Sequence, residues 1–575
     1  MLSAVKTPRQ AHLWSLYRVN PRVQRASLSL YKAPRFWNEP EVFLKPAAPV
    51  PFFKGSPERA KLTESILKLK KELPATIRLP QNPGDSTIEQ RNPSAHKQVI
   101  ANWQPATEQD VEKAIEVALN ARESWQERTL EDRAAIFLRA AELVSTKYRY
   151  ELIAATMLGQ GKNIWQGEID AGAEICDLLR WYVQCAFELH AQQPHHSRLG
   201  TWNRQEYRPL EGFVYSIFPF NFTALGTNLA FGPALMGNTV IWKPSNSALH
   251  ASWLLYKVMI EAGMPPDVVQ WVPGDPEMVT RVCLDHKDLA GISFTGSTQV
   301  FKGLLAKVGE NTGKNVYRQY PRMVGETGGK NFHLIHKSAN IDNAVNQTIR
   351  GAFEYQGQKC SATSRVYVPQ SVWPEFKKKI VERTAKLKIG NPEKYDNFVN
   401  SVIHETSFDK LNSVIQKAKS DPGVELLVGG KASKEDGYYV HPTIYQVTDP
   451  KHELMVHELF GPIAAIYVYP DNEWERVIKD VDSTSEYGLT GSVFAQDQSA
   501  LAYAEKHLRN AAGNFYINVK ATGAVIGHQP FGGTRGSGTN DKVGSMNVVS
   551  RFASVRTISE NFGFLDEVEY PSNEV

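Results

Sequence analysis

Residues 213–245 read FVYSIFPFNFTALGTNLAFGPALMGNTVIWKPS, and this stretch decides the fold class. No charged residue occurs from position 212 to 242, and the stretch contains two short apolar runs, FVYSIF and TVIW. Comparable runs begin at Val268 (VVQWV) and Gly291 (GISF), with helical or loop patterns between them. Short strands that alternate with helices at this spacing predict βαβ units and a parallel sheet.

The uncharged stretch is too broken to cross a membrane. It contains Pro219, Pro233, four glycines and three asparagines. A spanning helix needs about 20 predominantly apolar residues whose backbone is satisfied internally. We therefore expect a strand, a loop, a helix and a second strand in a buried α/β core, and no membrane span.

The expected strands all end in residues typical of loops. These endings are PFN (219–221), KPS (243–245), PGD (273–275) and TGS (295–297). Ligands of open α/β sheets bind beyond the carboxyl ends of the strands. The four loops therefore predict where a nucleotide would lie.

Further elements extend from this centre in both directions. A second α/β region is expected from about 326 to 531, with apolar runs at 332–335, 364–368, 464–468 and 491–495 and a helix near 372–387. On the N-terminal side, apolar residues at helical spacing after Thr107 predict amphipathic helices to about residue 190. Residues 40–106 are rich in proline, and we expect an irregular arm there.

Composition excludes several classes of protein. The chain has 575 residues, enough for several domains, and 42% hydrophobic and 22% charged residues are ordinary globular usage. Four cysteines exclude a disulfide scaffold. The net charge of +4 comes from residues 1–38, which hold seven Lys or Arg and no Asp or Glu. We therefore expect no nucleic-acid partner.

The acid-free leader, rich in Arg and Ser, is typical of a mitochondrial transit peptide. A basic N-terminal tail without a targeting role is the alternative. We place the transit peptide at residues 1–25, with cleavage between Arg22 and Ser29, and expect the mature protein in the mitochondrial matrix.

Four features of the sequence can carry chemistry. Cys360, in GQKCSA, is a candidate nucleophile next to the positive charge of Lys359. Glu326, in GETGGKN, is a candidate general base beside two glycines. The turn FTGS (294–297) presents backbone N–H groups to a pyrophosphate, and Asn221 can donate to an oxyanion. Each also has an ordinary alternative: a buried inert cysteine, a solvated loop glutamate, and two plain turns.

The order of the motifs is more specific than any one of them. They are FPFNF (218–222), WKPS (242–245), FTGS (294–297), ETGGKN (326–331), GQKC (357–360) and ELFGP (458–462). In this order they resemble the aldehyde dehydrogenase superfamily over roughly residues 80–560. Three longer segments resemble the mitochondrial branch that oxidises L-glutamate γ-semialdehyde to L-glutamate in proline degradation: FPFNFTALGTNLAFGPALMGN (218–238), GQKCSATSR (357–365) and FGGTRGSGTNDKVG (531–544).

The resemblance implies an α/β fold with a doubly wound NAD-binding domain, an α/β catalytic domain and a β-hairpin oligomerisation flap. We place these parts at 26–195 with 211–325, at 326–535, and at 196–210 with 536–575. The hairpin is expected at Ser197–Tyr207, and Val548–Ile558 would supply its matching strand. A homodimer or higher homo-oligomer is the implied assembly, because an exposed edge strand favours pairing with another subunit.

The resemblance also implies a role for each site residue. Cys360 would be the nucleophile that forms a hemithioacetal and then a thioester, Glu326 the base that activates water, and Asn221 an oxyanion donor. NAD is the implied cofactor, and no metal is implied. Cofactor contacts would come from Phe218, Phe220, Lys243, Ser245, Phe294, Thr295, Gly296, Ser297, Glu458 and Phe460. Contacts to the small-molecule substrate would come from Phe222, Lys359, Ser361, Gly523, Ala524 and Phe531, with Thr522 in the same loop.

Three positions depart from the family pattern. Asn246 stands where many members have an acid that repels a 2′-phosphate, so NADP remains a weaker alternative cofactor. Ala524 stands where a serine is usual, which removes one hydrogen bond to the substrate carboxylate. Thr363 replaces a cysteine, with no expected mechanistic effect.

Other functions within and outside the superfamily remain to be weighed. One is oxidation of another acidic semialdehyde, and another is a CoA-acylating reaction, which needs no general base and is therefore disfavoured by Glu326. A catalytically silent relative is disfavoured because both Cys360 and Glu326 are present. A phosphate- or nucleic-acid-binding α/β protein is disfavoured by the charge and by the order of the six motifs.

Overall fold

The computed structural model describes residues 52–574, and at its centre lies the expected parallel sheet. All of its neighbouring strands are parallel, which confirms the four predicted strands and their direction. The predicted transit peptide and residues 40–51 lie outside the described residues. The sheet has the order β7-β6-β5-β8-β9, with β5 (Phe213–Ile217), β6 (Thr239–Lys243), β7 (Val269–Trp271), β8 (Leu289–Thr295) and β9 (Arg322–Glu326).

Helices cover both faces of this sheet because side chains alternate along each strand. Phe213 and Tyr215 pack in one cluster with α3 (Glu108–Gln126), α10 (Pro276–Leu284) and α11 (Thr298–Gly313). Val214, between them, packs in a larger cluster with α4, α7 and α9 (Leu249–Ala262). The predicted helical region is confirmed as α3, α4 (Leu130–Ser145), α5 (Arg149–Gln160), α6 (Ile164–Gly167), η2 (Glu168–Glu174) and α7 (Ile175–His190).

The uncharged stretch folds as expected. Between β5 and β6 the chain forms a loop and two short helical segments, η3 (Thr227–Phe231) and α8 (Gly232–Leu235). Both segments are fully buried. Among residues 52–574 no helix combines the length and apolar character that a membrane crossing requires.

The prediction of an irregular arm at 40–106 is wrong for much of the described part. Helix α2 (Pro57–Glu72) begins at the N-cap Ser56 and buries only Leu62, Ile66 and Leu69. A small sheet follows, in the order β1-β3-β2, from β1 (Ala75–Ile77), β2 (Ile88–Asn92) and β3 (Ala95–Trp103). The apolar signal of α2 is three residues in a charged sequence, which explains why the pattern was missed.

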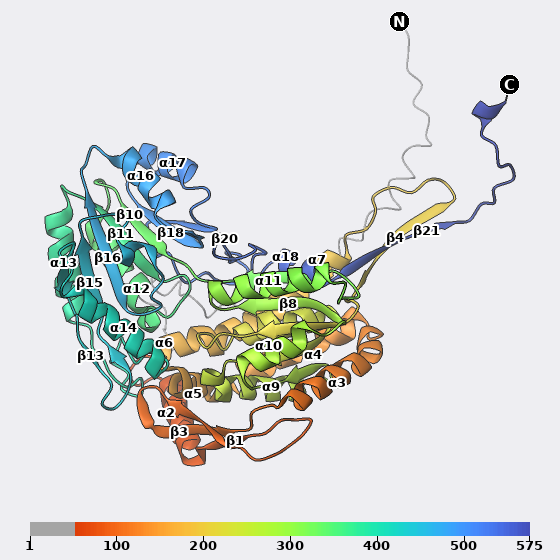
Figure 1. The fold of residues 1–575 in the computed structure, drawn as a ribbon, viewed down its shortest axis with the longest axis horizontal. Helices are drawn as coiled ribbons and strands as arrows, with labels where there is room; N and C mark the ends of the chain where they lie inside the picture. The colour runs from red at the N-terminus through yellow and green to blue at the C-terminus, as the bar shows by residue number, and fades with distance from the viewer. Residues whose placement is uncertain (1–51, 575) are drawn as a thin grey trace, which may run out of the picture.

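A second, seven-stranded sheet forms the other lobe (Figure 1). All of its strands are parallel except the edge strand β12. Its order is β12-β15-β16-β11-β10-β18-β19, with β10 (Asn331–Ile335), β11 (Thr363–Pro369), β12 (Val424–Val428), β15 (Thr443–Val447), β16 (Ile463–Tyr469), β18 (Thr490–Phe494) and β19 (Asn514–Ile517). The four apolar runs predicted here are confirmed as β10, β11, β16 and β18.

The helices of this lobe include the predicted one, confirmed as α13 (Trp373–Ala385). The longer ones besides it are α12 (Ile341–Phe353), α14 (Glu405–Ala418), α16 (Trp474–Ser483) and α17 (Gln498–His507). The short elements of the chain are η4 (Asn246–Ala248), η5 (Glu354–Gly357), β13 (Ala432–Ser433), β14 (Tyr439–Val440), α15 (Glu453–Val456), β17 (Tyr487–Gly488), β20 (Thr534–Arg535) and η6 (Pro571–Asn573).

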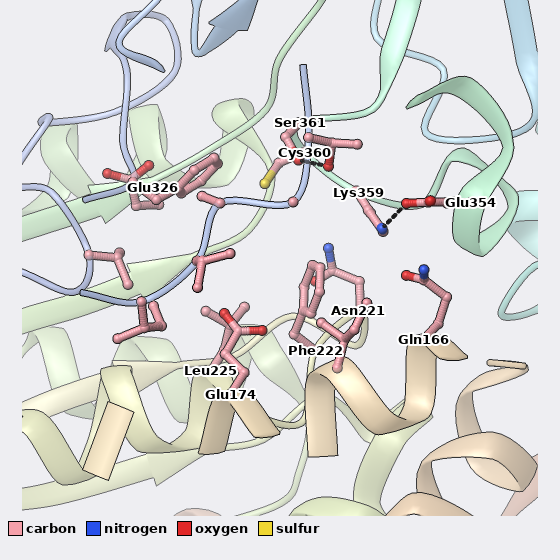
Figure 2. Close-up of a pocket in the computed structure, with 18 of the residues that line it drawn as sticks. Gln166, Glu174, Asn221, Phe222, Leu225, Glu326, Glu354, Lys359, Cys360 and Ser361 are labelled. Carbon is pink, nitrogen blue, oxygen red and sulfur yellow. Dashed lines mark hydrogen bonds and ion pairs between the residues drawn. The ribbon is translucent and has the colours of Figure 1, made fainter. Parts of the chain in front are cut away.

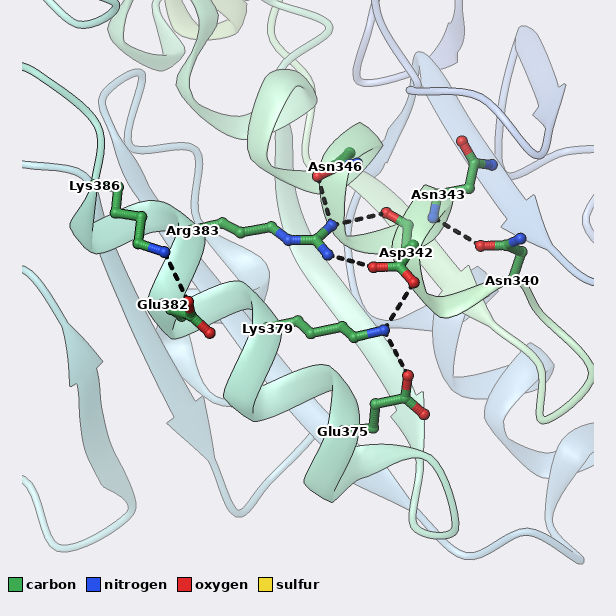
Figure 3. A network of polar contacts seen from close by, with 9 residues as sticks. All are labelled: Asn340, Asp342, Asn343, Asn346, Glu375, Lys379, Glu382, Arg383 and Lys386. Atoms are coloured by element: carbon green, nitrogen blue, oxygen red, sulfur yellow. Dashed lines mark hydrogen bonds and ion pairs between the residues drawn. The ribbon is translucent and has the colours of Figure 1, made fainter.

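A surface network fixes α12 against α13 (Figure 3). Asp342 on α12 accepts from Lys379 at 2.8 Å and also pairs with Arg383, both on α13. On the other side of α12, Asn343 Nδ2 donates to the carbonyl of Asn518 at 2.8 Å. Exposed ion pairs contribute little free energy of unfolding, about 0–1 kcal/mol each. These contacts instead fix the position of α12, which leads directly into the segment before Cys360.

A two-stranded ribbon extends away from both lobes (Figure 1). β4 (Thr201–Arg208) pairs antiparallel with β21 (Ser554–Asn561) along its whole length. Pairing between the two predicted regions is therefore confirmed, but two details were wrong. Residues 197–207 form no hairpin of their own, because within them only the part from Thr201 is strand, as β4. The region predicted as a strand from Val548 begins with α18 (Met546–Arg551), which buries Val548 and Val549.

Candidate active site

One pocket between the two lobes is lined by all the predicted catalytic and substrate residues (Figure 2). Glu326 lines it from the end of β9, Cys360 from the loop before β11, and Asn221 from the loop after β5. The predicted substrate residues that line it are Phe222, Lys359, Ser361, Gly523, Ala524 and Phe531. Residues far apart in sequence thus meet in a single cavity, as the motif order suggested.

Cys360 lies in the loop between η5 and β11. Its carbonyl accepts from Asn331 Nδ2 at 2.7 Å, which fixes the backbone of the nucleophile. Burial raises the pKa of the Cys360 thiol to about 12, and the nearby carboxyl groups of Glu326 and Glu458 add to this shift. The thiol is therefore protonated at neutral pH, and it needs a base before it can attack.

Lys359, which the sequence suggested as a positive charge beside Cys360, is ion-paired with a buried carboxylate. Its Nζ lies 3.1 Å from Glu354 Oε2, and the Nζ of Lys520 lies 3.0 Å from the same carboxylate. Burial alone would raise the pKa of Glu354, but the two ammonium groups lower it to about 2. Lys359 thus belongs to a buried group of charges at the substrate side of the pocket.

Glu326 ends β9 and is 5% exposed. Its Oε2 has no hydrogen-bond partner among the described residues. Burial raises the pKa of the carboxyl well above its ordinary value, although Lys542 opposes the shift and Asp541 adds to it. A carboxylate with a raised pKa is a stronger base than an ordinary one.

The two glycines after Glu326 provide space. A Cβ on Gly328 would collide with the Glu458 carboxylate, and a Cβ on Gly329 would collide with the carbonyl of Cys360. Close approach of the two loops, and not backbone flexibility, is thus the physical reason for the Gly-Gly pair in this motif.

Asn221 is directed at the loop that carries the nucleophile. Its Nδ2 donates to the carbonyl of Gln358 at 3.1 Å, two residues before Cys360. Its Oδ1 is buried without a partner among the described residues. The amide therefore lies in the same pocket as the thiol and contacts the segment that carries it.

The substrate side of the pocket is tied together by a hydroxyl pair. Ser361 Oγ and Thr522 Oγ1 are 2.6 Å apart, which links the residue after Cys360 to the loop of Gly523 and Ala524. Ala524 itself offers only a methyl group. Any grip on a substrate carboxylate by this loop must therefore come from backbone N–H groups and from neighbours.

Lys243 lies at the carboxyl end of β6, where the nucleotide was expected. Its Nζ donates to the carbonyl of Pro244 at 2.9 Å and to Asn246 Oδ1 at 3.1 Å. Burial lowers the pKa of Lys243 to about 8. Ser245 follows and caps η4 through Ser247 N.

The turn after β8 has the features of a pyrophosphate site. Ser297 is the N-cap of α11, and Thr295 Oγ1 is buried without a partner among residues 52–574. The N-terminal N–H groups of a helix favour anions. The side chain of Phe294 has a different role from these polar groups. Its ring is buried and stacks on the ring of Phe301, with 5.4 Å between the ring centres, so it supports the turn from the core.

Of the remaining cofactor candidates, some lie at the loops between the lobes and one lies in the core. Glu458 Oε1 accepts from Gly329 N at 3.0 Å, and Phe460 packs edge-on to Phe220 at 5.8 Å across the two lobes. Phe218 is buried, and its ring packs on Trp242 at 4.8 Å. Its side chain therefore belongs to the core beneath the loop. The orphaned Thr295 hydroxyl, the buried Lys243 ammonium and the helix N-terminus together fit a dinucleotide.

Sequence reasoning missed several lining residues. Glu174, Gln166, Glu354 and Lys520 all line the pocket, but none lies in a recognised motif. Burial raises the pKa of Glu174 to about 8, with Asp170 adding to the shift. A carboxylate within a helical pattern carries no sign of its burial, so no pattern in the sequence singled it out.

Comparisons with known proteins identify the family of the chain. The family model described as "Aldehyde dehydrogenase family" matches residues 81–558. The mitochondrial delta-1-pyrroline-5-carboxylate dehydrogenase of Emericella nidulans is 53% identical over 96% of this chain and 96% of its own. The Homo sapiens enzyme of the same name is 44% identical over 90% and 92%. The Mycobacterium tuberculosis Delta-pyrroline-5-carboxylate dehydrogenase bound with NAD superposes with a TM-score of 0.86 at 43% identity, covering 92% of this chain and 99% of that one.

Proposed function

The chain belongs to the aldehyde dehydrogenase family, and from that premise we propose how this pocket oxidises L-glutamate γ-semialdehyde to L-glutamate with NAD. The observation that carries the proposal is the meeting of Cys360, Glu326 and Asn221 in one pocket with a lysine-bearing substrate side. The relatives named above support the same substrate and its place in proline degradation.

The first step is addition of Cys360 to the aldehyde. The thiol gives its proton to a base in the pocket, and Sγ forms a bond to the carbonyl carbon while the carbonyl π electrons move to oxygen. Asn221 Nδ2 and the N–H of Cys360 donate to that oxygen. Loss of one such donor typically costs about 10²–10³-fold in turnover.

The second step leaves an acyl group on the enzyme. When bound, NAD would supply the acceptor for the hydride that leaves the carbon. As the C–O π bond re-forms, Cys360 carries the acyl group as a thioester. The residues that would hold NAD are Lys243, Ser245, the turn 295–297, Glu458 and Phe460. Phe220 would pack beside them, and the rings of Phe218 and Phe294 would support these loops from the core.

The third step is hydrolysis by water. Glu326 takes a proton from the water as its oxygen bonds to the thioester carbon, and the C–S bond then breaks. Sγ regains a proton and L-glutamate leaves. The raised pKa of Glu326 suits this step because the carboxylate holds the abstracted proton strongly.

Specificity for an acid is assigned to the far side of the pocket. We propose that the substrate carboxylate lies against the backbone of 522–524, with Lys359 and Ser361 beside it. Phe222 and Phe531 would enclose the aliphatic chain.

A substrate panel tests the assignment. The rate of NADH formation is measured with L-glutamate γ-semialdehyde, succinate semialdehyde and a simple aliphatic aldehyde, each with NAD and with NADP. We expect the highest kcat/KM with the first substrate and NAD, and a weaker reaction with NADP. A higher kcat/KM with another aldehyde would contradict the assignment.

The wider organisation of the protein follows from the same premise. The protein is mitochondrial, and we propose the matrix as its compartment, with residues 1–25 as the transit peptide. We also propose the domain boundaries given above and a homodimer or higher homo-oligomer joined through the β4–β21 ribbon. The exposed apolar side chains of Trp202 and Val555 on this ribbon support that assembly.

A further inference from the structure

A completely buried ion pair lies beneath the active site. Lys162 Nζ is 2.7 Å from Asp170 Oδ2, and both side chains have an exposed fraction of 0%. Lys162 follows the end of α5, and Asp170 lies in the π-helical segment η2. Because both charges lose their hydration, a buried pair is a poor way to stabilise a fold, and π-helical turns often lie at functional sites. The pair therefore needs another explanation.

Asp170 holds the loop of the oxyanion donor. Its Oδ2 accepts from Thr223 N at 2.9 Å, and its Oδ1 accepts from Ala224 N at 2.8 Å. Gln160 Nε2 donates to the hydroxyl of Thr223 at 2.8 Å and adds a further tie. The backbone two and three residues after Asn221 is thus fixed from the core.

Lys162 joins that loop to the nucleophile segment. Its Nζ lies 4.3 Å from the ring centre of Phe222 on one side and 4.6 Å from that of Tyr355 on the other. Tyr355 has φ +50°, a left-handed backbone conformation, in η5, and Cys360 follows five residues later. Cation–π contacts of a desolvated ammonium are worth more than those at a surface. One ammonium therefore lies between the ring that follows Asn221 and a ring in the segment that leads to Cys360.

We propose that Lys162 and Asp170 are positioning residues that fix the oxyanion donor Asn221 relative to the nucleophile Cys360. The inference rests on the proposed function, because it gives the pair a role in the same reaction. A misplacement of about 1 Å can cost about 10²-fold in rate. Neither residue lines the pocket, so the effect should be on turnover and not on cofactor binding.

The test compares single and double variants. Lys162→Met and Asp170→Asn each leave one buried charge unpaired, so both should lower the Tm. The double variant Lys162→Met/Asp170→Asn removes both charges but keeps only one of the two oxygens that accept from Thr223 N and Ala224 N, so it should recover part of the lost Tm. We expect its kcat to stay about 10- to 100-fold below wild type, with the Kd for NAD, from titration of protein fluorescence, within about twofold.

The rate at which iodoacetamide alkylates Cys360 distinguishes an effect on the thiol from an effect on the oxyanion donor. Displacement of iodide at a saturated carbon builds no oxyanion, so the alkylation rate of the double variant should remain near wild type. A matched control is Arg149→Met/Glu168→Gln, which removes the neighbouring pair of the part-buried Arg149 and the buried Glu168, also anchored on η2, without changing the loop of Asn221. Its kcat should be near wild type.

Two results would overturn the inference: a kcat of Lys162→Met/Asp170→Asn within twofold of wild type, or an equal loss of kcat in the control. Should the double variant fail to fold, Tyr355→Leu and Tyr355→Phe decide. Tyr355→Leu removes the ring over Lys162 and should lower kcat. Tyr355→Phe keeps the ring and should keep kcat near wild type. Equal kcat values for the two would count against the pair. Failure of the proposed function is distinguishable, because the wild-type enzyme would then not oxidise the semialdehyde.

Discussion

At the scale of single residues, Cys360 is a partly exposed thiol beside two carboxyl groups. Because its pKa is raised to about 12, the thiol has to lose its proton before it can attack. Two of its neighbours, Glu326 and Glu458, raise that pKa.

Cys360→Ala tests the nucleophile. The variant should form no NADH from the aldehyde, because no other described cysteine lies in the pocket. NAD should still bind, since the residues assigned to the cofactor are unchanged, and a fluorescence titration checks this. Retained turnover would remove Cys360 from the mechanism.

Glu326→Gln tests the base and its pKa together. We expect steady-state turnover to fall about 10²–10⁴-fold, the usual contribution of a general base. In the wild type, turnover should rise as pH increases through the raised pKa of Glu326, because only the carboxylate accepts a proton. A pH–rate profile with its midpoint near the ordinary value of 4.5 would contradict the burial argument.

The same substitution should also change stability. The pKa of Glu326 is higher in the folded state than its ordinary value of 4.5 in the unfolded state. Its contribution to stability is therefore fully present below pH 4.5 and is lost as pH rises through the pKa of the folded state. Glutamine stays neutral throughout. The Tm of Glu326→Gln should therefore exceed that of wild type at about pH 8 and approach it at about pH 4. If the variant and the wild type had equal Tm values at both pH 8 and pH 4, burial of the ionised carboxyl would not lower the stability of the protein.

At the scale of elements, the sequence was a good guide wherever a strand is buried on both faces. The four apolar runs from Phe213 to Gly291 became β5 to β8 because burial on both faces requires continuous apolar residues. The ribbon strands β4 and β21 are half exposed and polar, so their pattern was weak. Helix α18 took residues predicted as strand because Ser545 caps it and Val548 and Val549 are buried.

The site was predictable in its membership but not in its internal contacts. The motifs identified Cys360, Glu326 and Asn221, and one pocket contains all three. The partners of Lys359 were not predictable, since Glu354 and Lys520 belong to no motif. The rings of Phe218 and Phe294 face the core, and a sequence motif does not distinguish a ring that touches a ligand from one that supports the loop.

The loop 522–524 provides a test at this scale. Ala524→Ser would add one hydroxyl donor facing the proposed carboxylate site. A hydrogen bond to a charged acceptor is worth about 1.5–3 kcal/mol, so the KM for the semialdehyde should fall by at least several-fold with little change in kcat. Steady-state kinetics with a neutral aliphatic aldehyde is the control, and its KM should not fall. An unchanged KM for the acid would count against this placement.

At the scale of the whole molecule, two lobes close over one pocket and a ribbon extends away from them. Trp202 and Val555 are 52% and 48% exposed on this ribbon. Large exposed apolar side chains on a projecting strand pair favour contact with another subunit. The variant Trp202→Glu/Val555→Glu should therefore shift the assembly toward monomers, measured by light scattering over a range of concentrations.

A matched control for this prediction is Leu67→Glu on α2, which is 56% exposed on the body of the first lobe. It should leave the molar mass unchanged. A ribbon variant with the wild-type molar mass at every concentration would exclude the ribbon as the joining surface.

The account depends most on a covalent intermediate at Cys360 that Glu326 releases. The most direct measurement is intact-protein mass spectrometry of Glu326→Gln after mixing with NAD and L-glutamate γ-semialdehyde, followed by mapping of the modified peptide. We expect one NADH per active site and a mass increase of one γ-glutamyl group on Cys360. An unmodified Cys360 after that NADH has formed, or the acyl group on another residue, would contradict it.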